Sequence, residues 1–186
     1  MTNKASSTPL SGVLKRNLDE LHRRFGVSAD LVIRPLEVDG RSAAVVSVEG
    51  MIDRHLMADA VVLPLMRIQQ SLEPDALMEH IQTHVLGFTD FLRADTFEQL
   101  IELMMSGFAA VMLDGVNYSV LGGLQAFMIR GITEPSAETT MRGSREGFTE
   151  ALRINMSMIR RRMKTPDLVF EMMSGGRSSH TAICLC

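Results

Sequence analysis

Two groups of charged residues in the last third of the chain are the first candidates for chemistry. A basic run consists of Arg160, Arg161, Arg162 and Lys164, and four glutamates precede it at Glu134, Glu138, Glu146 and Glu150. Paired carboxylates perform acid–base catalysis when they converge in a dry pocket with separated pKa values. These glutamates instead fall on a polar stretch and on the first turns of a predicted helix. We therefore interpret them as structural and expect that the protein is not an enzyme.

Three interpretations of the basic run stay open. Cations near the C-terminus of a helix are stabilised by the helix dipole alone. The run could also pair with Glu134, Glu138 or Glu150 of a neighbouring subunit, or it could contact anionic lipid headgroups. Arginine outnumbers lysine in the run, and arginine makes bidentate pairs with carboxylates and phosphates. We therefore favour a contact between subunits.

Other candidate ligands are few. His80 and His84 share one helix face at a spacing that suits zinc, but the sequence offers no third ligand, so we expect no metal site. Cys184 and Cys186 point to opposite sides of an extended segment. We expect no disulfide between them and a reducing, cytosolic environment. Neither of the common glycine-rich phosphate-binding patterns occurs, so we expect no cofactor.

The overall composition indicates a globular domain that can bury a core. Of the 186 residues 46% are hydrophobic, and the net charge of -3 argues against nucleic acid as the partner. The 15 methionines are interpreted as core filler. Residues 57–66 form the most apolar central stretch, which is half the length of a membrane span and contains Asp59 and Pro64. The first residues lack the apolar region of a secretion signal.

Periodicity predicts an α/β (α+β) subdomain over residues 11–130, after a disordered start over residues 1–10. Two hairpins with Asp-Gly turns should form a small mixed sheet that is packed by helices. The predicted strands are 30–38 and 42–48 in the first hairpin, and 108–113 and 117–124 in the second. The predicted helices are 11–26, 53–69 with a kink or break at Pro64, 74–85, and one capped by Asp95 or Thr96.

Residues 131–166 are predicted to form a linker with a basic amphipathic helix. Ser144 is a good N-cap for this helix, which should reach Met163 and be stopped by Pro166. Its apolar stripe is expected to contain Phe148, Leu152, Asn155 or Met156, Ile159 and Met163. Residues 167–186 read as the truncated beginning of a second small α/β subdomain, with Gly175-Gly176 ending a helix before a strand over 182–186.

The stretch from Arg130 to Leu168 resembles the hallmark segment of the GerA family of spore germination proteins. An Arg and Glu-Pro, an Arg-Gly turn, Glu-Gly-Phe-x-Glu, an Asn and Ile-Arg-Arg-Arg occur in that order. The matching residues are Arg130, Glu134, Pro135, Glu138, Arg142, Gly143, Arg145, Glu146, Gly147, Phe148, Glu150, Asn155, Ile159, Arg160, Arg161 and Arg162. Ser144 departs from the Pro of many members, although both residues suit a helix start. Residues 30–38, 48–66 and 104–115 also resemble family segments.

The resemblance implies the soluble N-terminal module of a germinant receptor A subunit, with two small α/β subdomains joined by a helical linker. Family members sense nutrient germinants in the spore inner membrane together with B and C subunits, and they release ions as dormancy ends. The A subunit is expected to form homo-oligomers and to reach the membrane through a C-terminal part that follows this region. This region would lie on the cytoplasmic side, and nutrient binding is assigned to the B subunit.

The linker residues that match the family pattern are the expected subunit or linker contacts. They are Glu134, Glu138, Arg142, Arg145, Glu146, Phe148, Glu150, Asn155, Arg160, Arg161 and Arg162. The alternative from another functional class is a small-molecule-binding or enzymatic α/β domain, which a pocket with convergent polar groups would favour. A nucleic-acid-binding helix is a third possibility, which the acidic overall charge disfavours.

Overall fold

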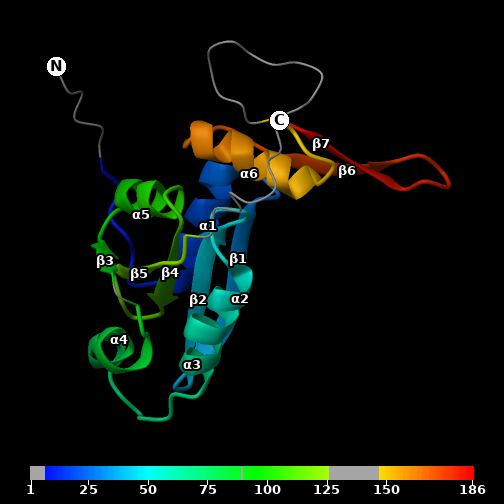
Figure 1. The fold of residues 1–186 in the computed structure, drawn as a ribbon. Coiled ribbons are helices and arrows are strands. Elements are labelled where there is room, and N and C mark those ends of the chain that lie inside the picture. The colour runs from blue at the N-terminus through cyan, green and yellow to red at the C-terminus, as the bar shows by residue number, and fades with distance from the viewer. Residues whose placement is uncertain (1–6, 89, 126–146) are drawn as a thin grey trace.

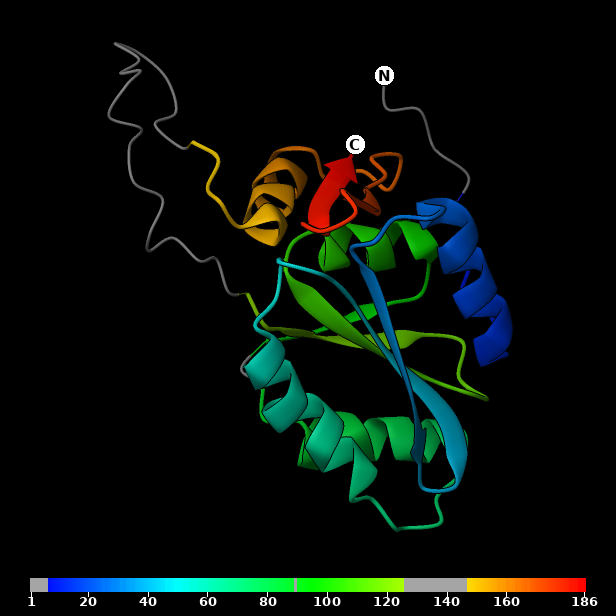
Figure 2. The same ribbon diagram turned by 90° about the vertical axis from the view of Figure 1, so that its right-hand side faces the viewer.

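The fold was described in a computed structural model, which places residues 7–88, 90–125 and 147–186. A five-stranded sheet with helices on both faces forms the main body, and a helix and a hairpin follow it (Figures 1 and 2). The strands of the sheet are β1 (Leu31–Val38), β2 (Arg41–Val48), β3 (Phe91–Ala94), β4 (Phe108–Leu113) and β5 (Ser119–Gly123). They lie in the order β1-β2-β4-β5-β3.

All four pairings in this sheet are antiparallel. The α+β class and the two adjacent hairpins are therefore confirmed, whereas the sheet is antiparallel rather than mixed. Strand β3 was not predicted from the sequence, because its four residues carry too short a pattern to stand out. It pairs with β5 and forms the edge of the sheet opposite β1.

Alternation along the two central strands explains why helices cover both faces. Residues 43, 45, 109, 111 and 113 face one helical layer, and residues 44, 46, 48, 110 and 112 face the other. All of these side chains are buried, as expected for strands covered on both sides. Helices α1 (Leu14–Phe25) and α5 (Phe97–Met104) pack on the second face.

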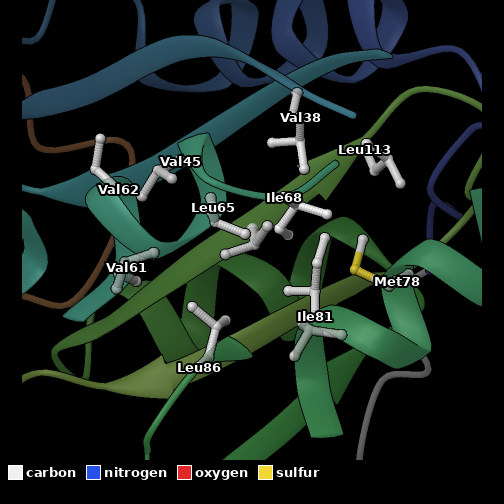
Figure 3. Close-up of a cluster of buried hydrophobic side chains, with 14 of the residues drawn as sticks. Val38, Val45, Val61, Val62, Leu65, Ile68, Met78, Ile81, Leu86 and Leu113 are labelled. Carbon is white, nitrogen blue, oxygen red and sulfur yellow. The ribbon is translucent and has the colours of Figure 1, made fainter. Parts of the chain in front are cut away.

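The first face is covered by two helical stretches that each contain a π-helical segment. One consists of α2 (Arg54–Met57), η1 (Ala58–Val62) and α3 (Leu63–Met66), and the other of α4 (Pro74–His80) and η2 (Ile81–Val85). Their apolar side chains meet those of the sheet in the core that Figure 3 shows, where Leu65, Met78 and Ile81 are fully buried.

Pro64 does not break the first of these stretches. The backbone N–H of Leu63 donates to the carbonyl oxygen of Ala58, five residues earlier, so the turn before the proline is widened. Proline has no N–H and its ring crowds the preceding turn of a regular α-helix. A wide turn at this point removes that crowding, and the chain stays helical from Arg54 to Met66.

Residues 7–10, which fall within the predicted disordered start, pack on the main body. Thr8 and Leu10 exchange backbone hydrogen bonds with the segment before α5, and Leu10 is buried. Helix α1 begins at Leu14 rather than Ser11. Its first N–H groups lack a local side-chain cap, but the carboxylate of Asp114 accepts a hydrogen bond from the N–H of Leu14 at 2.8 Å. The second Asp-Gly turn thus caps a helix that is a hundred residues away in sequence.

The turn of the first hairpin is fastened to the loop after α3 by one carboxylate. Asp39 accepts hydrogen bonds from the backbone N–H groups of Gln70, Ser71 and Leu72 at 2.8–2.9 Å. The bond from Ser71, then those from Leu72 and Gln70, lower the pKa of Asp39 below its ordinary value. The ionised form therefore contributes stability that is present above the unfolded-state pKa and is lost as the pH falls through the lower, folded-state pKa.

We expect Asp39→Asn to destabilise the protein at neutral pH and to cost less as the pH falls. The amide leaves one acceptor oxygen and presents N–H groups to backbone donors, whereas acid already removes the charge from the wild type. Urea unfolding at several pH values between 7 and 3 measures this difference. Asp19→Asn, an exposed carboxylate on α1, removes the same charge as a control. A difference between Asp39→Asn and wild type that stays constant with pH would contradict the assignment.

The last helix, α6, spans Leu152–Arg162, so it starts seven residues later than an N-cap at Ser144 predicts. Residues 147–151 are not helical, because Asn155 folds back on Thr149 and accepts a hydrogen bond from its N–H at 2.7 Å. Ser144 itself lies outside the described residues. Strands β6 (Glu171–Gly175) and β7 (Thr181–Leu185) form a separate hairpin. Gly175-Gly176 therefore ends a strand, and the prediction that it ends a helix was wrong.

Candidate functional site

Arg160 lies on the last turn of α6 and is completely buried, with 0% of its surface exposed. Arginine is among the residues that are least often buried without a partner. The burial follows from the helix geometry, because Met156, Ser157 and Arg160 are spaced to lie on one side of α6 and all three are buried. The side of α6 that faces the main body thus presents a guanidinium group at its end.

The partner of Arg160 is Asp30, at the entrance to β1. Nε of Arg160 donates to Oδ2 of Asp30 at 2.7 Å, and Nη2 donates to Oδ1 at 3.1 Å. This is the bidentate geometry in which arginine binds a carboxylate most specifically. Asp30 is only 1% exposed, so the pair lies inside the protein. The ion pair joins two positions that are 130 residues apart in sequence.

The remaining donors of Arg160 are taken by the chain that follows α6. Nη1 donates to the carbonyl oxygen of Thr165, and Nη2 donates to that of Leu168 at 2.7 Å. The ring of Phe170 lies against the guanidinium at 4.9 Å between its centroid and Cζ. The turn between α6 and β6 is therefore wrapped around this one side chain.

Ser28 completes the arrangement, which we call the Arg160 cluster (Ser28, Asp30, Arg160 and Phe170). Its hydroxyl donates to Oδ1 of Asp30 at 2.6 Å and accepts from the N–H of Phe170 at 3.0 Å. The N–H of Ala29 also donates to the carbonyl oxygen of Phe170 at 2.8 Å. Among the residues that the structure describes, no buried side-chain N or O atom lacks a hydrogen-bond partner.

The cluster can fix an orientation, but it offers no group for catalysis. An arginine stays protonated at any physiological pH, and its partner carboxylate is saturated by donors. Removing two charges from water is costly, so a buried ion pair adds little net stability over an apolar contact. What it provides is a strong penalty for any arrangement in which only one partner stays buried. This penalty fixes the position of α6 on the main body.

Two further contacts hold α6 along its length. Cβ of Ser157 lies so close to Gly50 that a Cβ added at Gly50 would come within 2.5 Å of it. Gly50 also has a φ of +77°, which favours glycine over other residues. Nearer the start of the helix, Arg153 pairs with Glu49 at 3.5 Å. The end of β2 and the turn after it thus form the surface against which α6 packs.

The structure places the predicted site residues unequally. Glu134, Glu138, Arg142, Arg145 and Glu146 lie outside the described residues. Phe148 is 70% exposed rather than part of an apolar stripe, and Glu150 is exposed as well. Asn155 shapes the turn that precedes α6, by its bonds to Thr149. Arg161 is partly buried and Arg162 is exposed at the end of the helix.

For Arg160 the preferred interpretation from the sequence was wrong, since its carboxylate partner is Asp30 of the same chain and not a glutamate of a neighbouring subunit. Ser28, Asp30 and Phe170 were not recognised as site residues. One signal was available for Arg160, because it follows the apolar Met156 by four residues and shares its helix face. Nothing comparable indicated Asp30, which reads as an ordinary polar residue before a strand.

The other candidate ligands do not converge. The rings of His80 and His84 are stacked with their centroids 5.0 Å apart. In the described part of the chain no three His, Cys, Asp or Glu side chains are placed to hold a metal ion. Burial raises the pKa of the Cys184 thiol, which disfavours the thiolate form that binds metals.

The fold and the Arg160 cluster together define a class, namely a three-layer α+β domain with a helical extension anchored to it by a buried ion pair. The chain belongs to the GerA family, because the family model described as Bacillus/Clostridium GerA spore germination protein matches residues 19–186. None of the described helices is both long enough and apolar enough to span a bilayer.

Individual relatives agree with this family. The chain is 30% identical to spore germination protein KA of Bacillus subtilis, over 95% of this chain and 33% of that protein. It is 26% identical to spore germination protein B1 of the same species, over 92% of this chain and 36% of that protein. The chain thus spans about a third of the length of these relatives. Both relatives are named as spore germination proteins and not as enzymes.

A solved structure has the same fold. It is the N-terminal domain of the A subunit of the Bacillus megaterium spore germinant receptor GerK3. The TM-score is 0.73 at 27% sequence identity, and the match covers 96% of this chain and 66% of that one. The α+β architecture, including α6 and the hairpin, is therefore that of a germinant receptor domain.

Proposed function

We propose that this chain is the N-terminal module of the A subunit of a spore germinant receptor, and that it acts in subunit assembly and signal coupling rather than in catalysis. Its membership of the GerA family and its likeness to the GerK3 A-subunit domain support this role. In this proposal it works on the cytoplasmic side of the spore inner membrane. Its partners are the B and C subunits and further A subunits, with membrane attachment through a following C-terminal part and no nucleic acid.

The observation that carries the proposal is the Arg160 cluster. Because one buried guanidinium contacts the entrance of β1 and the turn before β6, any force on the hairpin is transmitted to the sheet. A module that couples parts of a receptor needs such a rigid connection, whereas a flexible linker would absorb the displacement. In this proposal, signal coupling depends on the fixed direction in which α6 leads from the main body to the hairpin.

We further propose the division into a first subdomain (11–130), a linker (131–166) and the beginning of a second subdomain (167–186). The β6–β7 hairpin supports this division, because Met173, Ile183 and Leu185 are 40–54% exposed on one of its faces. A two-stranded hairpin is at best marginally stable in water. We propose that the remainder of a second subdomain covers this face in the full receptor subunit.

The assembly role is tested with Arg161→Glu/Arg162→Glu in the spore-forming host. Arg161 is partly buried and Arg162 is exposed at the C-terminal end of α6, and neither belongs to the Arg160 cluster. The double change should therefore leave that cluster intact while it reverses two charges of the basic run. We expect the variant A subunit to fold but to recover less of the B and C subunits on affinity purification from spore membranes. Germination in response to nutrients should slow in parallel.

Lys15→Glu/Arg16→Glu is the matched control, because it reverses two exposed charges on α1, which is part of the main body. It should leave assembly unchanged. Normal recovery of the partner subunits with the α6 variant would contradict the assembly role, and turnover of a metabolite by the purified chain would contradict the non-catalytic role.

A further inference from the structure

Two histidines lie side by side on the surface of the helical stretch formed by α4 and η2. His80 is the last residue of α4 and is partly exposed, and His84 follows one turn later in η2 and is exposed. Their rings are stacked, with centroids 5.0 Å apart and an angle of 16° between the ring planes. Figure 1 shows α4 at the opposite end of the molecule from α6, so the pair lies apart from the Arg160 cluster.

A chain of hydrogen bonds determines which ring nitrogen of His84 carries the proton. The hydroxyl of Thr83 donates to the backbone carbonyl oxygen of Glu79 at 2.7 Å, and a carbonyl oxygen can only accept. Oγ1 of Thr83 also lies 2.6 Å from Nδ1 of His84. Because the single hydroxyl proton is already used, Nδ1 must be the donor in this second bond. The neutral ring of His84 therefore carries its available lone pair on Nε2.

This tautomer is the one that suits a metal ligand. A metal-binding histidine usually donates its other ring N–H to a fixed acceptor, which orients the ring and makes the ligating nitrogen more basic. Thr83 supplies that acceptor, and the carbonyl of Glu79 holds the Thr83 hydroxyl in turn. Within the described residues the ring of His80 makes no hydrogen bond, so it can turn toward an ion that is bound to His84.

We infer that His80 and His84 together bind a divalent transition-metal ion that prefers imidazole, such as Zn²⁺, with Nε2 of His84 as one ligand. The missing third ligand argues against a closed zinc site. It does not argue against an open one, in which water takes the remaining positions. The bound ion would join the end of α4 to η2 and stabilise the wide turn between them. The inference goes beyond the proposed role in assembly, which needs no metal.

The test follows the ring signals of the five histidines by NMR while Zn²⁺ or Mg²⁺ is added to the full chain. Before any metal is added, we expect His84 to show the tautomer with the proton on Nδ1. Zn²⁺ should then shift the signals of His80 and His84 together and saturably. Mg²⁺ should not shift them, because it prefers oxygen ligands. Since the two rings are read directly, zinc bound elsewhere on the chain does not disturb the result.

Three variants separate a built site from an ordinary pair of surface histidines. His84→Gln should abolish the saturable response at His80, whereas His22→Gln, which removes an exposed histidine of α1, should leave it unchanged. Thr83→Val keeps both ligands and removes the acceptor for Nδ1–H of His84. It should weaken Zn²⁺ binding about tenfold or more, because loss of an outer-shell partner typically costs about 10–100-fold in metal affinity.

The inference is overturned if Zn²⁺ leaves both rings unshifted, if Mg²⁺ shifts them as strongly, or if His84→Gln and His22→Gln respond alike. A proton on Nε2 of His84 in the metal-free wild type would overturn the assignment of the ligand atom. Unchanged Zn²⁺ affinity in Thr83→Val would overturn the role of Thr83. Receptor assembly is not measured in this titration, so these failures are distinguishable from failure of the proposed function.

Discussion

Replacement of Arg160 by alanine should lower the free energy of unfolding by about 3–5 kcal/mol. The change leaves the carboxylate of Asp30 buried, with the Ser28 hydroxyl as its remaining side-chain partner, and it frees the carbonyl oxygens of Thr165 and Leu168. An uncompensated buried charge is much more costly than the loss of an exposed ion pair. Urea unfolding gives the change in free energy, and amide hydrogen exchange locates it.

Exchange should accelerate most in α6 and in the β6–β7 hairpin, while β2 and β4 keep more of their protection. Arg160→Lys should rescue little of the loss, because an ammonium group cannot reach Asp30, Thr165 and Leu168 in one plane. Arg162→Ala is the control on the same helix turn, where an exposed arginine should cost about 0–1 kcal/mol. Equal losses for Arg160→Ala and Arg162→Ala would contradict the role of the Arg160 cluster.

Substitution of Gly50 by alanine is expected to have the second largest effect, about 2–4 kcal/mol, from two separate causes. A φ of +77° strains any residue with a Cβ, and that Cβ would meet Cβ of Ser157 at 2.5 Å. The backbone strain acts within the turn after β2, whereas the steric clash pushes α6 away from the surface against which it packs. Denaturant unfolding combined with limited proteolysis of the segment before α6 separates a global loss from undocking of the helix.

Gly40 provides a closely matched comparison. It has the same φ of +77°, but nothing lies within 4 Å of the position of its Cβ. Gly40→Ala should therefore report the backbone strain alone, of order 1 kcal/mol. The excess loss in Gly50→Ala measures the contact with Ser157. If the two variants lose the same stability and the same protease resistance, then the close approach of α6 to Gly50 does not contribute to docking.

Local sequence patterns determined most of the main body. The Asp39-Gly40 and Asp114-Gly115 dipeptides supply residues that adopt the positive φ of tight turns, and they placed both hairpins correctly. Thr96 accepts from the N–H of Gln99 and caps α5 as its residue type predicts. The apolar run over 108–113 indicated a strand buried on both faces, which β4 is. These features depend on neighbours in sequence, so one sequence suffices to predict them.

Other features depended on specific side-chain and packing contacts, one of which joins residues a hundred positions apart. The start of α6 differs from the predicted start because the bonds between Asn155 and Thr149 fix residues 147–151 outside the helix. The side chain that caps α1 belongs to Asp114. Pro64 is accommodated by a wide helical turn between Ala58 and Leu63. Helix and strand propensities do not contain this information, because each is set by a contact that the folded chain creates.

The sequence by itself determined the family, the α+β class and the presence of a basic helix after the main body. Only the tertiary structure decided how the basic helix is placed, since the first of its three consecutive arginines is buried against Asp30, the second is partly buried and the third is exposed. Residue type alone does not distinguish a buried arginine from an exposed one. A guanidinium is stable in water, and it is also stable in a dry site that supplies a carboxylate and carbonyl oxygens. The pairing of Arg160 with a residue 130 positions earlier exists only once the sheet has formed.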